Sequence, residues 1–421
     1  MKILWIVNMV LPDIAKHLGV QTSPSGSWME DLSQKISESE NVELAVAAVS
    51  GDTFQDITIG NIRFFILPGS GKTMLFYNNG LVKYWKQIYG NFKPDIVHLH
   101  GTEYSHGLSF LRTYPKVKAV VSIQGIISRI KDVALEGFSI FSLLRYRTFK
   151  ENIKLNGMVE NTLLMRKNAR YEQEILGRVR FVNVVNSWDM STVKSINPKL
   201  RCFQIDYNLR DSFYSSPKWD IRNMERCTVF TNPGGVPIKG LHNLLKALQI
   251  VKRECPDVKL LVPGMAAGKD GQLAIVNGYS KYIKVLIREL DLGKNIAFLG
   301  RLDDRQMVEH MLKSHVVVIP SAIEGTSLML REAMFLGVPA IASFRGGMAD
   351  FIHDKESGYL YDYPEYPYLA YRILELFSND TLAVSFSVNA IKQAEEAHNR
   401  HKNPEKYLDM YKEIFASGGI L

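Results

Sequence analysis

An alternation of strand and helix patterns, present in both halves of the chain, most constrains the fold. In the first half, short apolar runs predict strands, and segments with helical spacing, such as Ser27–Ser37 and Leu81–Tyr89, lie between them. Such alternation indicates mostly parallel sheets with both faces covered, and therefore an α/β protein. The predicted strands of this half are Ile3–Val10, Val42–Val49, Ile62–Leu67, Ile96–His100, Ala119–Ile123, Val179–Val185 and Leu200–Ile205.

The second half begins the same alternation again after a polar stretch. Residues Ser215–Arg226 are polar and lack periodicity, so we place the inter-domain linker at about Asp206–Met224. Two Rossmann-like domains with a cleft between them are the natural architecture, with residues 1–206 in the first and 207–400 in the second. The predicted strands of the second half are Thr228–Thr231, Lys259–Val262, Ile296–Leu299, His315–Ile319 and Pro339–Ser343, and the helices are Leu241–Glu254, Tyr279–Leu290, Asp304–Lys313 and Leu328–Leu336.

The composition of the chain indicates which cellular compartment and which kind of binding partner to expect. The chain has 421 residues, three widely spaced cysteines and a net charge of +8. The odd number and wide spacing of the cysteines favour a reducing compartment and argue against a structural zinc site. The positive charge favours an anionic partner, such as a nucleotide or a phospholipid surface. No Lys/Arg run with interleaved aromatic residues indicates nucleic-acid binding, and no apolar run reaches the roughly 20 residues of a membrane-spanning helix.

The stretch Ile319–Gly358 carries the strongest indication of a site. Ser327 can cap the predicted helix Leu328–Leu336, whose first backbone N–H groups can bind an anion. Glu324 lies in the loop before this helix and Glu332 lies on it, eight residues apart. Two carboxylates around an anion-binding turn suit a ligand that is both a phosphate and a polyol.

Loops of the first half also meet the condition for ligand binding, because each follows the carboxyl end of a predicted strand. Ser25 and Gly26 precede a helix and can contact a phosphate or sugar through backbone N–H groups, although a plain turn has the same composition. His98 and His100 flank a strand end, where a structural histidine and a functional one are both consistent with the sequence. The loops are Pro12–Gly26, His98–Glu103 and Gln124–Ser128.

The segment Ile130–Arg170 combines aromatic and basic residues, and its bases outnumber its acids. An aromatic and basic helix pair can rest on an anionic membrane surface. A helix packed on the sheet with a solvated basic face has the same composition, so both interpretations stay open.

The residues of Ile319–Gly358 resemble a known motif. The run Pro320-Ser321-x-x-Glu324-Gly325, with Glu332-Ala333-Met334 and Gly337-x-Pro339, resembles the E-x7-E motif of retaining GT-B glycosyltransferases and is most similar to glycosyltransferase family 4. The resemblance implies a GT-B fold, with two Rossmann-like domains facing across a central cleft and a C-terminal helix, residues 401–421, packing back on the first domain. Weaker similarities to this family lie at Asp95–His100, Lys239-Gly240 and Tyr407–Phe415.

The resemblance also implies roles for the residues that match it. Glu332 would hold the donor ribose hydroxyls, and Glu324 would contact the hydroxyls of the transferred sugar. Lys239 would neutralise the leaving phosphate, and the N–H groups of Thr326 to Leu328 would face the diphosphate. The implied set comprises catalytic Lys239 and Glu324; donor-binding Gly234, Gly235, Gly264, Gly325, Thr326, Ser327, Leu328 and Glu332, with Arg301 and Leu302 at the base; acceptor-side Ser25, Gly26, His100 and Gln124; and no metal ligand.

Some positions depart from the family pattern. Gly234 stands where the family usually has an arginine, so one cation on the leaving group is missing or is supplied by another residue such as Arg345 or Arg301. Gln124-Gly125 replaces the H-D or H-G of a first-domain strand end, and Asn208-Leu209 replaces an Asn-Gly pair. These departures leave the identity of the donor open.

Given this resemblance, we expect a metal-independent, retaining transfer of a hexose to a glycan or lipid-linked oligosaccharide in surface-polysaccharide biosynthesis. The co-substrate is a nucleotide diphosphate sugar, with UDP favoured and GDP as the alternative, and no further cofactor or nucleic acid is expected. We expect a cytoplasmic protein, either free or in contact with anionic lipid at the inner face of the plasma membrane. The alternatives on this fold are a non-catalytic nucleotide-sugar-binding subunit and a sugar-nucleotide epimerase.

Overall fold

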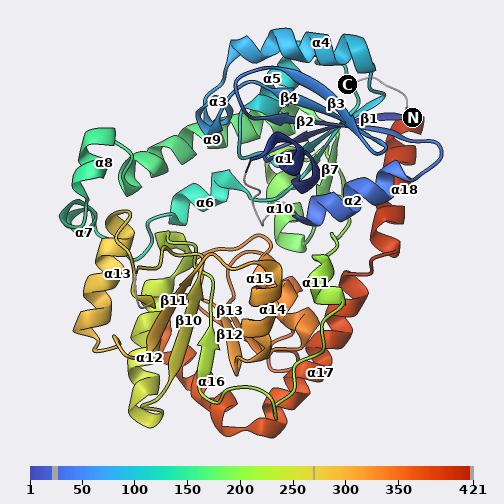
Figure 1. Cartoon of the computed structure of the whole chain (residues 1–421). Helices are drawn as coiled ribbons and strands as arrows, with labels where there is room; N and C mark the ends of the chain where they lie inside the picture. The colour runs from blue at the N-terminus through green and yellow to red at the C-terminus, as the bar shows by residue number, and fades with distance from the viewer. Residues whose placement is uncertain (21–26, 269–270, 418–421) are drawn as a thin grey trace. The chain divides into compact units, whose positions relative to one another are not determined.

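A computed structural model describes residues 1–20, 27–268 and 271–417, which form two compact units. Unit 1 comprises Met1–Arg129, Met165–Arg210 and His398–Leu421, and unit 2 comprises Ile130–Leu164 and Asp211–Ala397. Each unit is built on its own mostly parallel sheet with helices on both faces (Figure 1). None of the described helices is long and apolar enough to span a bilayer.

The sheet of unit 1 has eight strands, which largely match the predicted ones. In chain order they are β1 (Lys2–Val7), β2 (Glu43–Val49), β3 (Gln55–Ile59), β4 (Ile62–Leu67), β5 (Ile96–His100), β6 (Ala119–Ser122), β7 (Phe181–Val184) and β8 (Arg201–Gln204). Their spatial order is β3-β4-β2-β1-β5-β6-β7-β8, and only β3 and β4 pair antiparallel. The strand order reverses between β1 and β5, and parallel sheets bind ligands at the carboxyl ends of the strands beside such a point.

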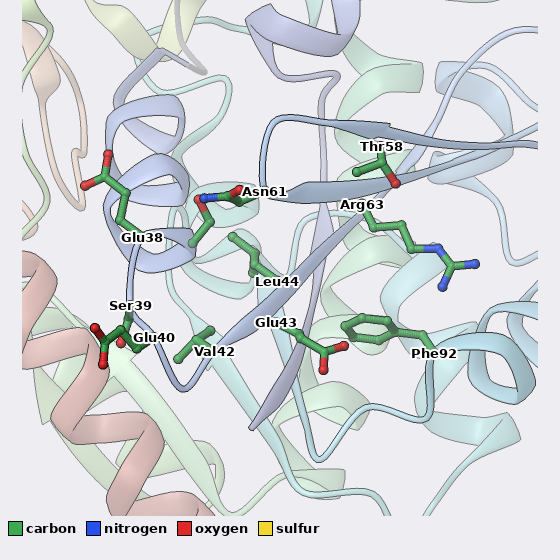
Figure 2. Close-up of a pocket in the computed structure, with 11 residues that line it drawn as sticks. Glu38, Ser39, Glu40, Val42, Glu43, Leu44, Thr58, Asn61, Arg63 and Phe92 are labelled. Atoms are coloured by element: carbon green, nitrogen blue, oxygen red, sulfur yellow. The ribbon is translucent and has the colours of Figure 1, made fainter.

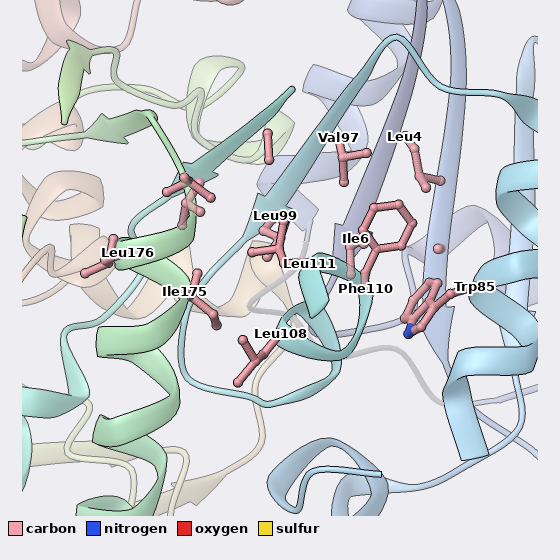
Figure 3. Close-up of a cluster of buried hydrophobic side chains, with 14 of the residues drawn as sticks. Leu4, Ile6, Trp85, Val97, Leu99, Leu108, Phe110, Leu111, Ile175 and Leu176 are labelled. Carbon is pink, nitrogen blue, oxygen red and sulfur yellow. The ribbon is translucent and has the colours of Figure 1, made fainter. Parts of the chain in front are cut away.

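Successive side chains of β1 enter two different hydrophobic clusters. Ile3, Trp5 and Val7 belong to one cluster, whereas Leu4 and Ile6 belong to the other, which Figure 3 shows. Because successive side chains of a strand point to opposite faces, both faces of this sheet are buried. The helices of unit 1 are α1 (Pro12–Leu18), α2 (Ser27–Ser37), α3 (Gly71–Leu75), α4 (Val82–Phe92), α5 (His106–Thr113), α10 (Ser187–Ile196) and α18 (Lys402–Ala416), with most of α9 (Met158–Arg178) and the start of α6 (Ile127–Val133), which continues into unit 2.

The C-terminal helix α18 is joined to this sheet by buried hydrogen bonds. The Tyr411 hydroxyl accepts from Trp5 Nε1 at 2.9 Å and lies 2.6 Å from His98 Nδ1. The Tyr407 hydroxyl accepts from Asn183 Nδ2 at 3.1 Å. The expected packing of the C-terminal helix on the first half of the chain is therefore confirmed, and His98 has a structural role.

The sheet of unit 2 has six strands, all parallel. They are β9 (Thr228–Phe230), β10 (Lys259–Pro263), β11 (Ile296–Gly300), β12 (Val316–Ile319), β13 (Ala340–Ser343) and β14 (Tyr359–Tyr361), in the spatial order β11-β10-β9-β12-β13-β14. The order reverses between β9 and β12, so their carboxyl ends flank the switch point of this unit. Its helices are α7 (Ile140–Arg145), α8 (Phe149–Lys154), α11 (Asp211–Tyr214), α12 (Leu241–Glu254), α13 (Gly278–Glu289), α14 (Asp304–Leu312), α15 (Leu328–Leu336), α16 (Tyr366–Ser378) and α17 (Asp380–Ala397).

Some elements differ from their prediction. We predicted a loop over Pro12–Gly26, but its first part is the helix α1, which begins at Pro12, where the missing N–H of proline costs nothing. The edge strands β3 and β14 were not predicted. The predicted linker is packed in its second part, because the buried Trp219 donates from Nε1 to the Ser314 carbonyl oxygen at 2.9 Å and from its backbone N to Leu336 O at 2.7 Å.

The segment Ile130–Leu164 departs from the expected division of the chain. It precedes residue 206, where we placed the end of the first domain, yet it is part of unit 2. Ring contacts explain this position: the Phe138 ring lies 5.0 Å from His242 and 4.9 Å from Tyr282, centroid to centroid. The compact units therefore do not follow the order of the chain.

Candidate functional site

Two loops meet at the switch point of unit 2. One follows β9 and passes through the short helix η3 (Pro237–Lys239) into α12, and the other follows β12 and leads into α15. The backbone N–H of Ala322 donates to the Ile238 carbonyl oxygen at 2.7 Å, which joins the loops directly. Gly240 has a φ of 69°, and a Cβ there would lie 1.7 Å from the Pro320 carbonyl oxygen. Only glycine allows this approach.

The junction brings together the two residues that we predicted to be catalytic. The ammonium group of Lys239 pairs with the carboxylate of Glu324, whose Oε1 also accepts from Ser321 Oγ at 2.8 Å. The Glu324 backbone is fixed as well, because its carbonyl oxygen accepts from Gly347 N at 2.8 Å. A cation and a hydrogen-bonded carboxylate thus lie side by side at the carboxyl edge of the sheet.

The helix α15 starts and ends where the sequence predicted. Ser327 caps it by accepting from Leu330 N at 3.3 Å, and Gly337, with a φ of 83°, ends it. Its amino terminus, with the backbone of Gly325, Thr326 and Leu328, follows the loop that carries Glu324. Glu332 lies on the same helix and is buried. This half of the site therefore combines helix N–H groups with two carboxylates, as an anionic polyol requires.

The other predicted donor-binding residues lie at neighbouring strand ends of the same sheet. Gly264 follows β10, and Arg301 and Leu302 follow β11. The Gly264 N–H donates to the Gly300 carbonyl oxygen at 2.7 Å, which holds these two strand ends together. Gly234 and Gly235 both have left-handed backbones, with φ values of 59° and 72°, in the loop after β9.

Arg345, one candidate for a second cation, is already bound within unit 2. Its Nη1 donates to both carboxylate oxygens of Glu136 at 2.5 and 2.7 Å, and its Nη2 donates to the Tyr363 carbonyl oxygen at 2.7 Å. These contacts use the donors with which the guanidinium would hold a phosphate. Arg345 therefore joins Ile130–Leu164 to the rest of unit 2 in this structure.

Two of the predicted acceptor-side residues, His100 and Gln124, lie at the carboxyl edge of the sheet of unit 1. His100 ends β5, and its ring stacks on that of His98 and contacts that of Trp5 at a tilt, with ring centroids 4.0 and 4.4 Å apart. Burial lowers the pKa of His100 to about 3, so its imidazole is neutral. Neither of its ring nitrogens, nor the Gln124 amide nitrogen, has a hydrogen-bond partner among the described residues. Ser25 and Gly26 lie outside the described residues.

Sequence reasoning missed Glu103, which lies beside the switch point of unit 1. Its carboxylate accepts from Asn8 Nδ2 at 3.1 Å, and Asn8 directly follows β1. Burial raises the pKa of Glu103 to about 7, and the neighbouring Glu172 carboxylate adds to the rise. The only signal in the sequence was its place at the end of the loop His98–Glu103, because a single glutamate forms no motif. A carboxyl group that changes charge near neutral pH is a candidate for proton transfer or hydroxyl binding.

A pocket in unit 1 lies at the opposite edge of the sheet (Figure 2). Glu43 and Leu44 at the start of β2 and Arg63 at the start of β4 line it, together with Phe92 at the end of α4. Ligands of parallel sheets bind at the carboxyl ends of the strands, so this pocket is separate from the candidate site.

Comparison with known proteins places part of the chain in a family. Residues 223–393 match the profile of the family described as "Glycosyl transferases group 1". An uncharacterised glycosyltransferase of Bacillus subtilis is 26% identical over 47% of this chain and 52% of its own length. A poly(ribitol-phosphate) α-N-acetylglucosaminyltransferase of Staphylococcus aureus is 28% identical over 42% of this chain and 33% of its own. A phosphatidyl-myo-inositol mannosyltransferase of Mycobacterium leprae is 26% identical over 59% of this chain and 62% of its own length. The matches thus cover between a third and two thirds of these relatives.

Solved structures resemble the chain over nearly its whole length. Sucrose-phosphate synthase from Thermosynechococcus elongatus superposes with a TM-score of 0.75 at 15% identity. The superposition covers 99% of this chain and 100% of the synthase chain. The Anabaena protein HepE, solved with UDP-glucose, gives a TM-score of 0.67 at 16% identity, covering 98% and 100% of the two chains. These likenesses confirm the expected fold class. Residues 223–393 thus resemble the group 1 glycosyltransferases, in a chain with the GT-B fold.

Proposed function

We propose that this protein transfers a hexose from a nucleotide diphosphate sugar to a glycan or lipid-linked oligosaccharide, with retention of the anomeric configuration. The observation that carries the proposal is the pair Lys239–Glu324 at the switch point of unit 2, beside the amino terminus of α15. Anionic ligands bind at such a helix terminus, and a lysine beside it can accept the charge that develops on a leaving diphosphate. The family of residues 223–393 supports the same chemistry.

The donor is bound in unit 2 in this proposal. The N–H groups of Thr326 to Leu328 and the Lys239 ammonium hold the diphosphate, and the Glu332 carboxylate accepts hydrogen bonds from the ribose hydroxyls. Glu324 orients the transferred sugar, while Arg301 and Leu302 contact the base. When the substrate enters, its phosphate replaces Glu324 as the partner of Lys239, which frees the carboxylate for the sugar.

The acceptor is bound in unit 1, where His100, Gln124 and Glu103 face the carboxyl edge of the sheet. A neutral imidazole, an amide and a carboxyl group can all bind sugar hydroxyls. In the transfer, the bond from the anomeric carbon to the donor phosphate breaks and a bond to the acceptor oxygen forms on the same face. The acceptor proton passes to the departing phosphate oxygen, so no metal ion is required.

A UDP-sugar is the favoured donor. HepE was solved with UDP-glucose and TarM of S. aureus with UDP, whereas a relative from Corynebacterium glutamicum is named as GDP-mannose-dependent. We propose a cytoplasmic location with contact to the inner face of the plasma membrane, in surface-polysaccharide biosynthesis. The relative named for phosphatidyl-myo-inositol supports an acceptor that contains a lipid.

The direct test measures sugar transfer from UDP-glucose, UDP-N-acetylglucosamine and GDP-mannose to a membrane extract. We expect Lys239→Ala to lower the transfer rate by about 10²–10³, since removal of one group that stabilises a developing charge has this effect. Glu332→Ala should instead weaken donor binding, because the ribose hydroxyls lose a charged hydrogen-bond acceptor. Lys392→Ala, at an exposed position on α17, is the control. Full activity in both site variants would contradict the roles proposed for these residues. Failure to bind or hydrolyse any of the donors would contradict the proposed function.

One observation favours a second candidate, a non-catalytic nucleotide-sugar-binding subunit. The chain has glycine at 234, and Arg345 is bound to Glu136 instead of replacing the missing cation. This candidate predicts that the protein binds a UDP-sugar but transfers it to no acceptor in the extract. The anomeric configuration of any transferred sugar, read by NMR, tests retention separately.

A further inference from the structure

The most exposed apolar side chains of the described residues lie together on one short segment of unit 2. Phe149 on α8 is 80% exposed and Phe141 on α7 is 76% exposed. Ile153 and Leu155 follow, at 67% and 68%. Large apolar side chains that expose this much surface in one cluster mark a site of contact with a protein or a membrane.

Basic side chains alternate with these apolar ones. Lys150 and Lys154 are both exposed on α8, next to Phe149 and Ile153. We call Phe141, Phe149, Ile153, Leu155, Lys150 and Lys154 together the α7–α8 face. A surface with aromatic and aliphatic side chains between lysines suits the boundary of an anionic bilayer, where the apolar groups enter the acyl region and the ammonium groups meet the headgroups.

The acidic side chains of residues 139–164 do not offset this charge. Glu151 is buried, and it accepts from Gly278 N at 3.0 Å and Thr148 N at 2.8 Å. Glu160 accepts from Arg147 Nη2 at 2.7 Å. Both carboxylates are therefore engaged in holding the segment together, and the accessible charge of the face is positive.

The segment that carries the face is firmly joined to unit 2 on its other side. Arg345 binds Glu136, Glu151 caps the backbone at Gly278, and the Tyr146 ring lies 5.1 Å from that of Tyr282. Figure 1 shows α7 and α8 beside α13, which carries Tyr282. One surface of the segment is thus packed and hydrogen-bonded while the opposite one is apolar and basic, which is the arrangement of an interfacial membrane anchor.

We propose that the α7–α8 face binds the surface of an anionic lipid bilayer. A second copy of this chain suits the face less well, since a symmetric contact would place Lys150 and Lys154 against their own copies, in a chain with a net charge of +8. The proposal specifies the surface for the membrane contact included in the proposed function. It requires no catalytic step, so the two can fail separately.

The test is co-sedimentation of the full chain with phosphatidylcholine vesicles and with vesicles that contain about 30% phosphatidylglycerol, without nucleotide sugar. We expect binding to the anionic vesicles that weakens with salt. Phe141→Ser with Phe149→Ser should lower the partition coefficient by about tenfold or more, because the apolar area that enters the bilayer is lost. Lys150→Glu with Lys154→Glu should remove the preference for anionic vesicles.

Matched controls lie on α17 of the same unit. Val388 is 61% exposed and Lys392 is exposed, so Val388→Ser removes an exposed apolar side chain and Lys392→Glu reverses a charge elsewhere, and each should alter the partition by less than about twofold. Wild-type protein that binds neither vesicle, or face variants that bind like the wild type, would overturn the inference. A dimer in analytical ultracentrifugation that the Phe141→Ser, Phe149→Ser variant abolishes would also overturn it and assign the face to self-association. Unchanged UDP-glucose binding in the same variants keeps the outcome separate from the transferase proposal.

Discussion

Gly240 and the carbonyl oxygen of Pro320 approach so closely that a Cβ atom on the glycine would lie 1.7 Å from that oxygen. The contact joins the loop after β9 to the loop after β12 at the point where the strand order of unit 2 reverses. Lys239 and Glu324, one on each loop, lie next to this contact and pair with each other. The geometry of the proposed site therefore depends on a residue that carries no functional group.

Gly240→Ala should destabilise unit 2 and separate Lys239 from Glu324. The new methyl group overlaps a backbone oxygen, and the left-handed φ adds about 1–2 kcal/mol, so we expect a total loss of about 2–4 kcal/mol with the overpacking cost included. Gly234→Ala is the matched control, because Gly234 is also left-handed but its Cβ would meet nothing within 4 Å. Urea denaturation measures both, and equal losses would contradict the role of the Pro320 contact.

Gly234→Arg should increase affinity for UDP. The position has open space around it and lies in the same loop as Lys239, so a guanidinium there adds a cation near the proposed diphosphate site. We expect Kd to fall by about 3–10-fold, as one added hydrogen bond worth about 1 kcal/mol provides, at a stability cost of about 1–2 kcal/mol for the left-handed φ. Calorimetric titration measures the affinity. Gly234→Gln has the same backbone strain without the charge, and an equal gain from Gln would contradict the electrostatic explanation.

The sequence predicts the part of the site whose geometry is local. Ser327 at the start of α15 and Gly337 at its end act through backbone contacts within a few residues, and both positions were predicted correctly. Lys239 and Glu324 could also be singled out as candidates, since each lies in a run that resembles a family motif. The strand β4 was predicted to the residue because its side chains are nearly all apolar and buried.

Contacts between distant parts of the chain could not be predicted in this way. The ion pair Glu136–Arg345 joins residues 209 positions apart, and only the fold shows that Arg345 is engaged. The thiols of Cys227 and Cys255 lie 3.3 Å apart, although their spacing matches no motif. The edge strand β3 was missed because its side chains alternate between half-buried and exposed positions, which leaves a weak apolar signal.

Glu136→Gln should loosen Ile130–Leu164 without lowering the global stability much. The Glu136–Arg345 pair is partly exposed, and such pairs contribute about 0–1 kcal/mol. We expect faster hydrogen exchange in residues 136–155 and a nearly constant thermal midpoint. Glu160→Gln is the control, because it breaks an ion pair with Arg147 that lies wholly within the segment. This variant keeps the contact between Glu136 and Arg345 and should not loosen the segment from the rest of unit 2. Identical exchange in both variants would show that the rings of Phe138 and Tyr146 suffice to hold the segment.

Glu103→Gln should change how stability depends on pH. The pKa of Glu103 is raised by burial to about 7, so the folded state binds a proton that the unfolded state has released. The stabilisation from this proton is present below the unfolded pKa of about 4.5 and is lost as pH rises to 7. We therefore expect the stability of the wild type, relative to Glu103→Gln, to fall between pH 5 and 7 by at most about 1.4 kcal/mol per pH unit. Urea denaturation at several pH values measures the difference, and a constant difference would contradict the raised pKa.

His100→Phe should reduce the loss of stability in acid, with the opposite dependence on pH. Burial lowers the pKa of His100 to about 3, so the folded state keeps the ring neutral while the unfolded state takes up a proton below about pH 6.5. The stability from the neutral ring is present above that pH and falls as pH decreases toward 4. Phenylalanine keeps the ring contacts with Trp5 and His98 but does not titrate, so the variant should lose less stability between pH 6.5 and 4 than the wild type does. His401→Phe, at an exposed position, controls for the loss of a histidine, and a variant that follows the wild-type curve would show that His100 is not the group that titrates.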